Sequence, residues 1–367
     1  MPGVVSISYP TLVSSPLSLR TSIGESVSTS DEQAFGSHPQ ALGIILVKDL
    51  PSVYKSYRET LLKFSYKYAH LPEDIKERYT DPDSSYSFGW SHGKEIMNGK
   101  PGGFCEGLVA RISSSSYLDT LKGSYYANPI VDVPNVSPAI REQHREYYRE
   151  NIWPDANEKG VEGFESAFKD LGRFVFQVGC ELAAACEPFV SKHLGDTSFS
   201  LAELIARSQT TKARLLHYFP PNPADVKEVD DEPIDSWCGF HLDNSLLTGL
   251  CAAVFLREED DGQPSVVPSP SPESGLYIRT RGGELTKVSI PDDCLAFQTG
   301  EALELVTGGR LRATPHCVRV GGSCERISRE TFALFMQPDT HQKVSATETF
   351  GQFTKRILEK HYGKNST

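Results

Sequence analysis

A histidine and an aspartate stand two residues apart in the otherwise apolar stretch GFHLDNSLLTGL, residues 239–250. If this stretch is a β-strand, alternate side chains point to the same face, and His241 and Asp243 would lie side by side. An imidazole and a carboxylate that face one point could bind a metal or relay a proton. Such a pair alone is more often a surface pair or a hydrogen-bonded core histidine, so a third group is needed to decide.

A third candidate ligand lies far downstream. His316 belongs to the apolar run ATPHCVRV, which also reads as a strand. Two imidazoles and one carboxylate on one side of a metal form the facial triad of non-haem Fe(II) oxygenases, which leaves coordination positions open. Zinc accepts the same ligands, so the three residues predict a metal site without naming the metal.

The second half of the chain has the pattern of an antiparallel β structure. After residue 206, short apolar runs alternate with turns, and no helical pattern separates them, at 213–219, 245–256, 275–280, 285–290, 294–300, 313–320 and 331–338. This pattern predicts an antiparallel sandwich or jelly roll. The acidic, Pro- and Ser-rich residues 257–275 interrupt it and are expected to form a mobile surface loop.

The first half is expected to be mainly helical. Residues 41–50 read as a buried strand and 80–136 as loops, whereas helical spacing or helix-start signals occur at 52–70, 71–79, 139–151, 162–190 and 201–206. We therefore divide one α+β structural unit into four parts. They are an extended surface segment (1–40), a mainly helical region (41–206), a jelly-roll core (207–340) and a C-terminal segment (341–367) whose helix, at 347–362, packs on the core.

These features together resemble the Fe(II)/2-oxoglutarate-dependent dioxygenase superfamily, in the branch that includes isopenicillin N synthase and plant flavonoid and gibberellin oxygenases. The likeness rests on the HxD pair, the distal histidine, an R-x-S-like element and LPEDIK after the first predicted helix. It implies a double-stranded β-helix core flanked by N-terminal, central and C-terminal helices. It also implies Fe(II) held by His241, Asp243 and His316, with 2-oxoglutarate and O2 as cosubstrates.

Two registers compete for the 2-oxoglutarate anchor. Family members place Arg and Ser two residues apart on the last core strand, followed by Phe and Pro. Arg329 and Thr331 fit the whole pattern with Thr in place of Ser, whereas Arg326 and Ser328 match the short motif and lose the downstream residues. The two arginines are an odd number of residues apart, so only one can point into the barrel, and we favour Arg329 with Thr331. A fixed guanidinium fork would bind the distal carboxylate of 2-oxoglutarate.

A departure from the family lies in ARLLHYFPPNP. Relatives commonly carry a tyrosine immediately before the proline, where its hydroxyl helps to hold 2-oxoglutarate, and here that position is Phe219. His217 shares a face with Phe219 on a strand and is a candidate replacement donor. Tyr218 is a further candidate, although this reasoning places it on the other face.

The resemblance implies oxidative decarboxylation of 2-oxoglutarate to succinate and CO2, coupled to hydroxylation, desaturation or oxidative cyclisation at a substrate C–H bond. Asp243 argues against halogenation, because halogenases of the family usually lack this carboxylate. Phe335, which matches a family position near the substrate, is a candidate for the substrate pocket together with Leu247 and Phe240. All three are also explained by core packing. Among small-molecule substrates, an amino-acid-derived specialised metabolite is favoured.

Two other functions stay open at this point. An oxidase of the isopenicillin N synthase kind uses O2 without 2-oxoglutarate; the missing tyrosine favours it and Arg329 disfavours it. The other is a catalytically silent metal-binding scaffold that keeps the fold. Succinate formation would separate the first from a 2-oxoglutarate-dependent enzyme, and any turnover would exclude the second.

Composition narrows the partners and the compartment. The formal net charge is -11 and no basic block occurs, which argues against nucleic acid as a partner. No apolar stretch approaches a membrane span. The eight cysteines form no CxxC pair and the N-terminus is a poor secretory signal, so a cytoplasmic protein with reduced thiols is expected. Monomer is the default expectation.

Overall fold

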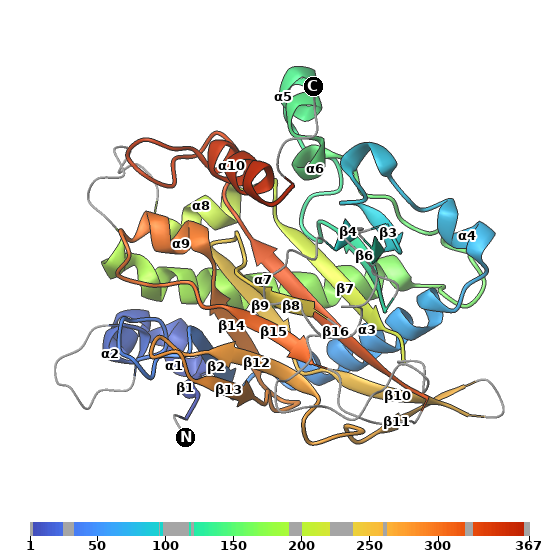
Figure 1. The fold of residues 1–367 in the computed structure, drawn as a ribbon, viewed down its shortest axis with the longest axis horizontal. Coiled ribbons are helices and arrows are strands. Elements are labelled where there is room, and N and C mark those ends of the chain that lie inside the picture. Colours follow the sequence, from blue (N-terminus) through green and yellow to red (C-terminus); the bar gives the residue numbers. More distant parts are fainter. Residues whose placement is uncertain are drawn as a thin grey trace.

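Two β-sheets pack face to face, and helices cover the outer face of the larger one (Figure 1). The computed structural model describes residues 3–24, 33–94, 96–97, 117–118, 121–190, 200–220, 238–259, 263–319 and 326–362. The predicted strand runs of the second half all form strands, and the α+β class with a jelly-roll core is confirmed.

The larger sheet carries the long central strands. Its order is β1 (Val5–Ser8), β2 (Ile44–Lys48), β14 (Leu295–Thr299), β9 (Leu247–Cys251), β16 (Ile327–Met336), β7 (Lys212–Tyr218), β6 (Lys122–Ala127) and β3 (Gly89–His92). Neighbours on this path pair antiparallel except β1 and β2, which are parallel. Both faces of β7, β9, β14 and β16 are largely buried, which explains their nearly continuous apolar sequences.

The smaller sheet closes the jelly roll on the other side. Its order is β13 (Leu285–Val288), β12 (Gly275–Arg279), β15 (His316–Arg319) and β8 (Cys238–His241). A separate two-stranded ladder joins β4 (Ile96–Met97) to β5 (Tyr117–Leu118). An apolar cluster lies between the larger and the smaller sheet. It includes Ile44 and Leu216 of the larger sheet and Ile278 and Val318 of the smaller one.

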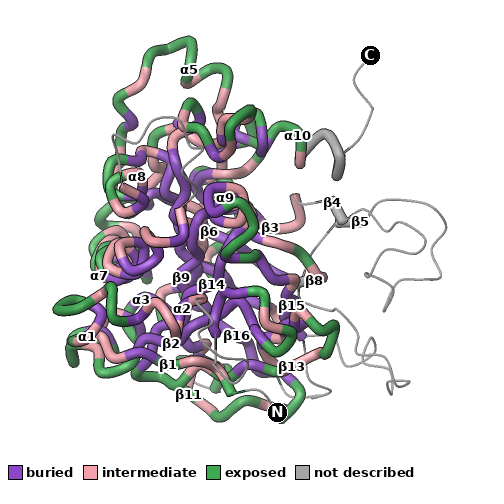
Figure 2. Tube along the Cα trace, turned by 90° about the vertical axis from the view of Figure 1, so that its left-hand side faces the viewer, coloured by how far each residue is buried: buried purple, intermediate pink, exposed green. Residues whose placement is uncertain are grey.

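Helices α3 (Val53–Ala69) and α7 (Phe164–Cys186) pack on the outer face of the larger sheet, and α8 (Leu201–Arg207) packs on α7. Buried residues recur along α7 at helical spacing, for example Leu171, Val175 and Val178, and join the main core cluster there. Figure 2 shows the buried residues gathered in the sheets and on the inner sides of these helices.

The remaining helices are short or peripheral. They are α1 (Tyr9–Ser14), α2 (Arg20–Ile23), α4 (Glu73–Glu77), α5 (Pro138–Gln143), α6 (Arg145–Tyr148), α9 (Glu301–Val306), α10 (Phe350–Tyr362) and the 3-10 turns Pro16–Leu19, Pro82–Ser84 and Glu187–Phe189. The helix expected at 139–151 is thus two short helices, whereas the other expected helices are present. Within the described part of the chain, no helix combines the length and the apolar character that crossing a membrane requires.

Three sequence expectations are wrong. Residues 5–23 are not an extended surface segment, because β1 joins the larger sheet and Leu12 and Ile23 are fully buried. Residues expected to be loops form β3 and β6 at the edge of that sheet. The supposed mobile loop contains β11 (Pro264–Val267), which forms a hairpin with β10 (Val254–Glu258). In each case backbone pairing with a distant or neighbouring strand outweighs a composition rich in Ser, Pro or acids.

Candidate metal centre and pocket

Three predicted metal ligands come together at one end of the smaller sheet. His241 is the last residue of β8 and His316 the first of β15, and the two face each other across the antiparallel ladder. Asp243 lies in the loop after β8, so the path of this loop, rather than the strand alternation assumed from sequence, brings it to His241. The backbone N–H of Glu301, at the start of α9, donates a 2.7 Å hydrogen bond to the backbone carbonyl of Asp243 and holds this loop.

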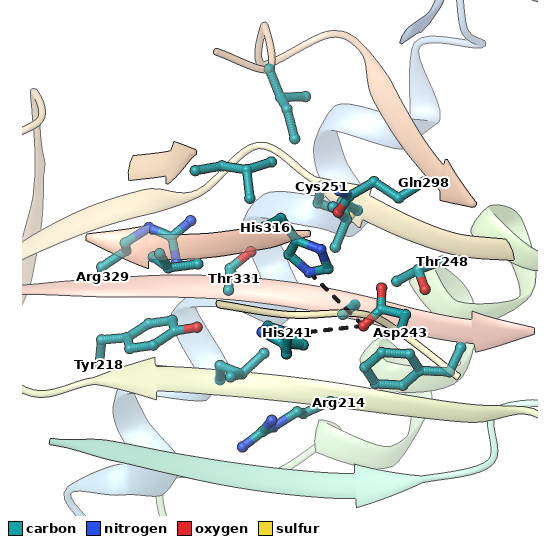
Figure 3. Close-up of a pocket in the computed structure, with 17 residues that line it drawn as sticks. Arg214, Tyr218, His241, Asp243, Thr248, Cys251, Gln298, His316, Arg329 and Thr331 are labelled. Atoms are coloured by element: carbon teal, nitrogen blue, oxygen red, sulfur yellow. Dashed lines mark ion pairs between the residues drawn. The ribbon is translucent and has the colours of Figure 1, made fainter. Parts of the chain in front are cut away.

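The three side chains converge on one point (Figure 3). Oδ1 of Asp243 lies 3.7 Å from Nε2 of His241 and 3.9 Å from Nε2 of His316. One ligand atom from each residue lies within 4.8 Å of the other two. Metal bonds to imidazole nitrogen and carboxylate oxygen are about 2 Å long, so one ion can reach all three.

The protonation states suit metal binding. Burial, and secondarily the His241 ring, lower the pKa of His316 to about 4, so its imidazole is neutral at pH 7 and loses no proton on binding a metal. Its Nδ1 lies 3.3 Å from the carbonyl oxygen of Thr314, which orients Nε2 toward Asp243. The side chain of His241 is 41% exposed, so the cluster opens to solvent on that side. Two imidazoles and one carboxylate fit a divalent first-row metal that keeps open positions.

A pocket extends from this cluster between the two sheets. It holds about 620 Å³, counting its open mouth. Apolar side chains make up much of its lining: Leu216, Leu250, Leu276, Ile290, Val318, Ala333 and Phe335. Polar side chains reach it as well, besides the three of the cluster: Arg214, Tyr218, Thr248, Gln298, Arg329 and Thr331.

The structure separates the two competing arginine registers. Arg329 and Thr331 alternate along β16 and both line the pocket. Arg326 lies before the strand, is 81% exposed and pairs with Glu258 at 2.9 Å. Ser328 faces the opposite side of β16, where it is buried. The Arg326 and Ser328 register therefore does not reach the pocket.

Tyr218 and His217 are placed opposite to the sequence prediction. Tyr218 lines the pocket, whereas His217 lies on the helix-covered side of β7 and is not among the lining residues. There its Nδ1 pairs with Oε1 of Glu330 at 2.8 Å. The prediction assumed that the residue next to the proline faces inward, but the structure turns the other set of alternate residues inward, including Arg214 and Leu216.

Of the three substrate-pocket candidates, Phe335 lines the pocket and the other two do not. Leu247 points into the main core beneath the helices, because its neighbour Thr248 takes the inward position on β9. Phe240 packs against Arg279, whose guanidinium carbon lies 5.1 Å from the ring centre. Both placements follow from strand parity.

Arg214 and Gln298 were missed by sequence reasoning. Each lies two or four residues from other inward residues of its strand, so the alternation of β7 and β14 was the available signal. The amide of Gln298 is buried, and neither its nitrogen nor its oxygen has a hydrogen-bond partner among the described residues. A polar side chain buried in this way inside a pocket is suited to meet a ligand or water.

Comparison with known proteins supports this architecture. No family model matches the sequence. The oxoglutarate-dependent flavonoid 7-O-demethylase 1 of Ocimum basilicum is 25% identical over 198 residues, which are 50% of this chain and 46% of that protein. The match thus spans about half the length of that relative.

Solved structures share the fold over nearly the whole chain. A putative 2OG-Fe(II) oxygenase family protein from Caulobacter crescentus aligns with a TM-score of 0.65 and 15% identity, over 98% of this chain and 100% of that one. A full-length protein of Neurospora crassa in complex with alpha-KG, which is 2-oxoglutarate, aligns with a TM-score of 0.63 and 16% identity, over 97% and 96%. At these identities the likeness concerns the fold.

Proposed function

We infer that this chain, which has the fold of the Fe(II)/2-oxoglutarate-dependent oxygenases, is an enzyme that oxidises a C–H bond of a small molecule. The observation that carries this inference is the meeting, in one pocket, of a His-Asp-His cluster and an inward-facing arginine. The fold alone is shared by proteins of many activities, so the side chains of the site must support the function.

His241, Asp243 and His316 would hold the metal, and their donor chemistry suits ferrous iron. Bound iron would supply activation of O2 coupled to decarboxylation of 2-oxoglutarate. Arg329 would bind the distal carboxylate of the cosubstrate with its guanidinium fork, and Thr331 is the neighbouring hydroxyl on the same face of β16. The apolar lining would exclude water from the substrate during reaction.

Tyr218 removes the main argument for an oxidase that works without 2-oxoglutarate. The tyrosine missing beside the proline gives that alternative some weight and Arg329 counts against it, but a tyrosine hydroxyl enters the pocket from the preceding position (Figure 3). Tyr218 and Arg329 together offer a hydroxyl and a cation to a dicarboxylic acid. A 2-oxoglutarate-dependent reaction is therefore the function that the site supports best.

An anaerobic titration of metal-free protein with Fe(II) and then 2-oxoglutarate tests the proposal. A saturable visible charge-transfer band of the chelated keto acid is expected. The band should be lost in His241→Ala and His316→Ala and kept in His341→Ala, which replaces an exposed histidine outside the pocket. Succinate release in air provides the second readout.

Each outcome has a defined meaning. Iron binding without a band, with O2 consumed and no succinate formed, would favour the oxidase. Iron binding with no turnover of either kind would favour a metal-binding scaffold. Equal iron affinity in His316→Ala and His341→Ala would remove His316 from the ligand set.

A further inference from the structure

Two arginines reach the same pocket, and the proposed cosubstrate accounts for one of them. Arg329 enters from β16 and Arg214 from β7, and Figure 3 shows them on different sides of the His-Asp-His cluster. In the β7–β16 ladder Arg329 stands opposite Tyr218, whereas Arg214 stands opposite Ala333. Four residues of β16 separate these two positions, which is about 13 Å of strand.

Contacts on the β6 side hold Arg214 away from Arg329. Its Nε donates a 2.9 Å hydrogen bond to Oγ of Ser124, a buried residue of β6. Its guanidinium carbon lies 5.1 Å from the ring centre of Tyr126, also on β6. A five-carbon dicarboxylate such as 2-oxoglutarate spans on the order of 6 Å between its ends and also has to chelate the metal, so it would not bridge both arginines.

The charges of the pocket favour an additional anion. Its described lining residues include two arginines and one carboxylate, that of Asp243. The two lining histidines carry no charge when they bind a metal. A divalent metal and dianionic 2-oxoglutarate would cancel each other's charge, which leaves the described lining residues with a net positive charge. Because the pocket is partly screened from water, this charge attracts an anion more strongly than it would in bulk solvent.

We propose that Arg214 binds the carboxylate of the substrate, so that the substrate is a small organic acid with an apolar body. This inference rests on the proposed function and adds a substrate class to it. The guanidinium plane, held between a hydroxyl and an aromatic ring, presents a fork that matches a carboxylate. Leu216 and Ala333, neighbours of Arg214 on the same inner surface, receive the apolar part, and Phe335 extends that surface.

The test uses matched pairs of molecules of nearly the same shape, one with a charged carboxylate and the other with a neutral amide. Arylalkanoic and alkanoic acids of graded length, such as 3-phenylpropanoate and hexanoate, are compared with their primary amides. The full-chain protein receives saturating 2-oxoglutarate throughout, so that Arg329 is occupied. The first readout is the shift in thermal midpoint on addition of each acid or amide. The second is acid-stimulated succinate release with Fe(II) in air.

Arg214→Gln and Arg214→Lys are the test variants, and Arg326→Gln is the matched control, since Arg326 is an exposed arginine outside the pocket. In the wild type and in Arg326→Gln, acids should bind about 10- to 100-fold more tightly than their amides, as expected for a charge-assisted bidentate contact. Arg214→Gln should lose this preference, and Arg214→Lys should keep part of it. The KM for 2-oxoglutarate in uncoupled turnover should stay within about twofold of wild type in all three variants, since Arg214 is not its anchor.

The two proposals fail in different ways. If succinate forms and acids show no advantage over amides, or if the advantage survives in Arg214→Gln, the carboxylate assignment is overturned and the oxygenase stands. If the thermal shift shows an acid preference that depends on Arg214 but no iron-dependent succinate forms, the anion site stands and the oxygenase falls. A preference lost equally in Arg326→Gln would overturn the role of Arg214.

Discussion

Arg329 and Tyr218 face each other across the β16–β7 ladder, and the guanidinium carbon of the arginine lies 5.1 Å from the centre of the tyrosine ring. Both side chains line the pocket that contains the His-Asp-His cluster. The ring supports the planar guanidinium from one side, which keeps the fork in a defined orientation. The next pair of the same ladder, Glu330 and His217, lies on the opposite face, beneath the helices.

Arg329→Ala is expected to raise the KM for 2-oxoglutarate about 10- to 100-fold, because a charge-assisted contact to the distal carboxylate is lost. Arg326→Ala should leave this KM unchanged, since that side chain is exposed and pairs with Glu258. Succinate release as a function of 2-oxoglutarate concentration measures both values. The reverse order of effects would show that the anchor had been assigned to the wrong arginine.

Tyr218→Phe removes one hydroxyl from the pocket and should raise the same KM about fivefold, as expected for a single hydrogen bond. Phe219→Tyr, which restores the tyrosine beside the proline, should not lower the KM, because Phe219 is not among the residues that line the pocket. Succinate kinetics of the two variants side by side provide the measurement. A gain in affinity from Phe219→Tyr together with no loss from Tyr218→Phe would contradict the observed parity of β7.

The fully buried pair of His217 and Glu330 should matter for stability. Oε1 of Glu330 interacts with Nδ1 of His217 and accepts a hydrogen bond from Oγ of Ser328, both at 2.8 Å. Glu330→Ala leaves these groups buried without their partner and is expected to cost about 3 kcal/mol in the free energy of unfolding. Glu258→Ala, at a more exposed glutamate, is the control. Urea denaturation measures the free energy of unfolding of both variants. Equal losses would show that the buried pair stabilises the protein no more than the exposed glutamate does.

Gln298→Leu should raise the stability of the ligand-free protein and weaken ligand binding. The amide of Gln298 is buried without a hydrogen-bond partner among the described residues, so an apolar side chain of similar size should stabilise the ligand-free protein by about 1 kcal/mol. If the amide meets a ligand in the pocket, the same change should weaken binding of 2-oxoglutarate or substrate several-fold. Thermal midpoints with and without 2-oxoglutarate and Fe(II) measure the first effect, and steady-state kinetics the second. A loss of stability in the ligand-free protein would contradict this account.

The lowered pKa of Lys212 predicts that the free energy of unfolding depends on pH. Burial lowers the pKa of Lys212 to about 7, although its ammonium lies 4.4 Å from the centre of the Phe88 ring. In the unfolded chain Lys212 keeps its proton up to about pH 10. Between pH 7 and about pH 10 the unfolded state therefore binds more protons than the folded state, and the free energy of unfolding rises with pH. The stabilisation is present at high pH and is lost as the pH falls toward 7.

Relative to Lys212→Met, which cannot titrate, the wild type should therefore gain about 1–3 kcal/mol between pH 7 and pH 9. Chemical denaturation of the two proteins at several pH values checks this. The comparison cancels the titration of groups that the two proteins share. A difference that stays constant over this range would show that Lys212 has an ordinary pKa in the folded protein.

The sequence by itself determined the elements and the chemistry of the cluster. Helical and alternating apolar patterns predicted the central helices and the strands of the jelly roll, because these patterns express burial on one face of a helix or sheet. His241, Asp243 and His316 could be selected because few residue types bind metals. Parity along one continuous strand allowed only one of Arg326 and Arg329 to face inward, and the family pattern with its downstream Phe and Pro favoured Arg329.

The tertiary structure alone decided which face of each central strand points inward. Both faces of β7, β9, β14 and β16 are buried, one under helices and one in the jelly roll, so hydrophobicity does not distinguish them. For this reason the sequence predicts the wrong face for Tyr218, His217 and Leu247 and does not single out Arg214 and Gln298. The loop that brings Asp243 to the histidines, and the pairing of β10 with β11, likewise depend on contacts made only when the chain is folded.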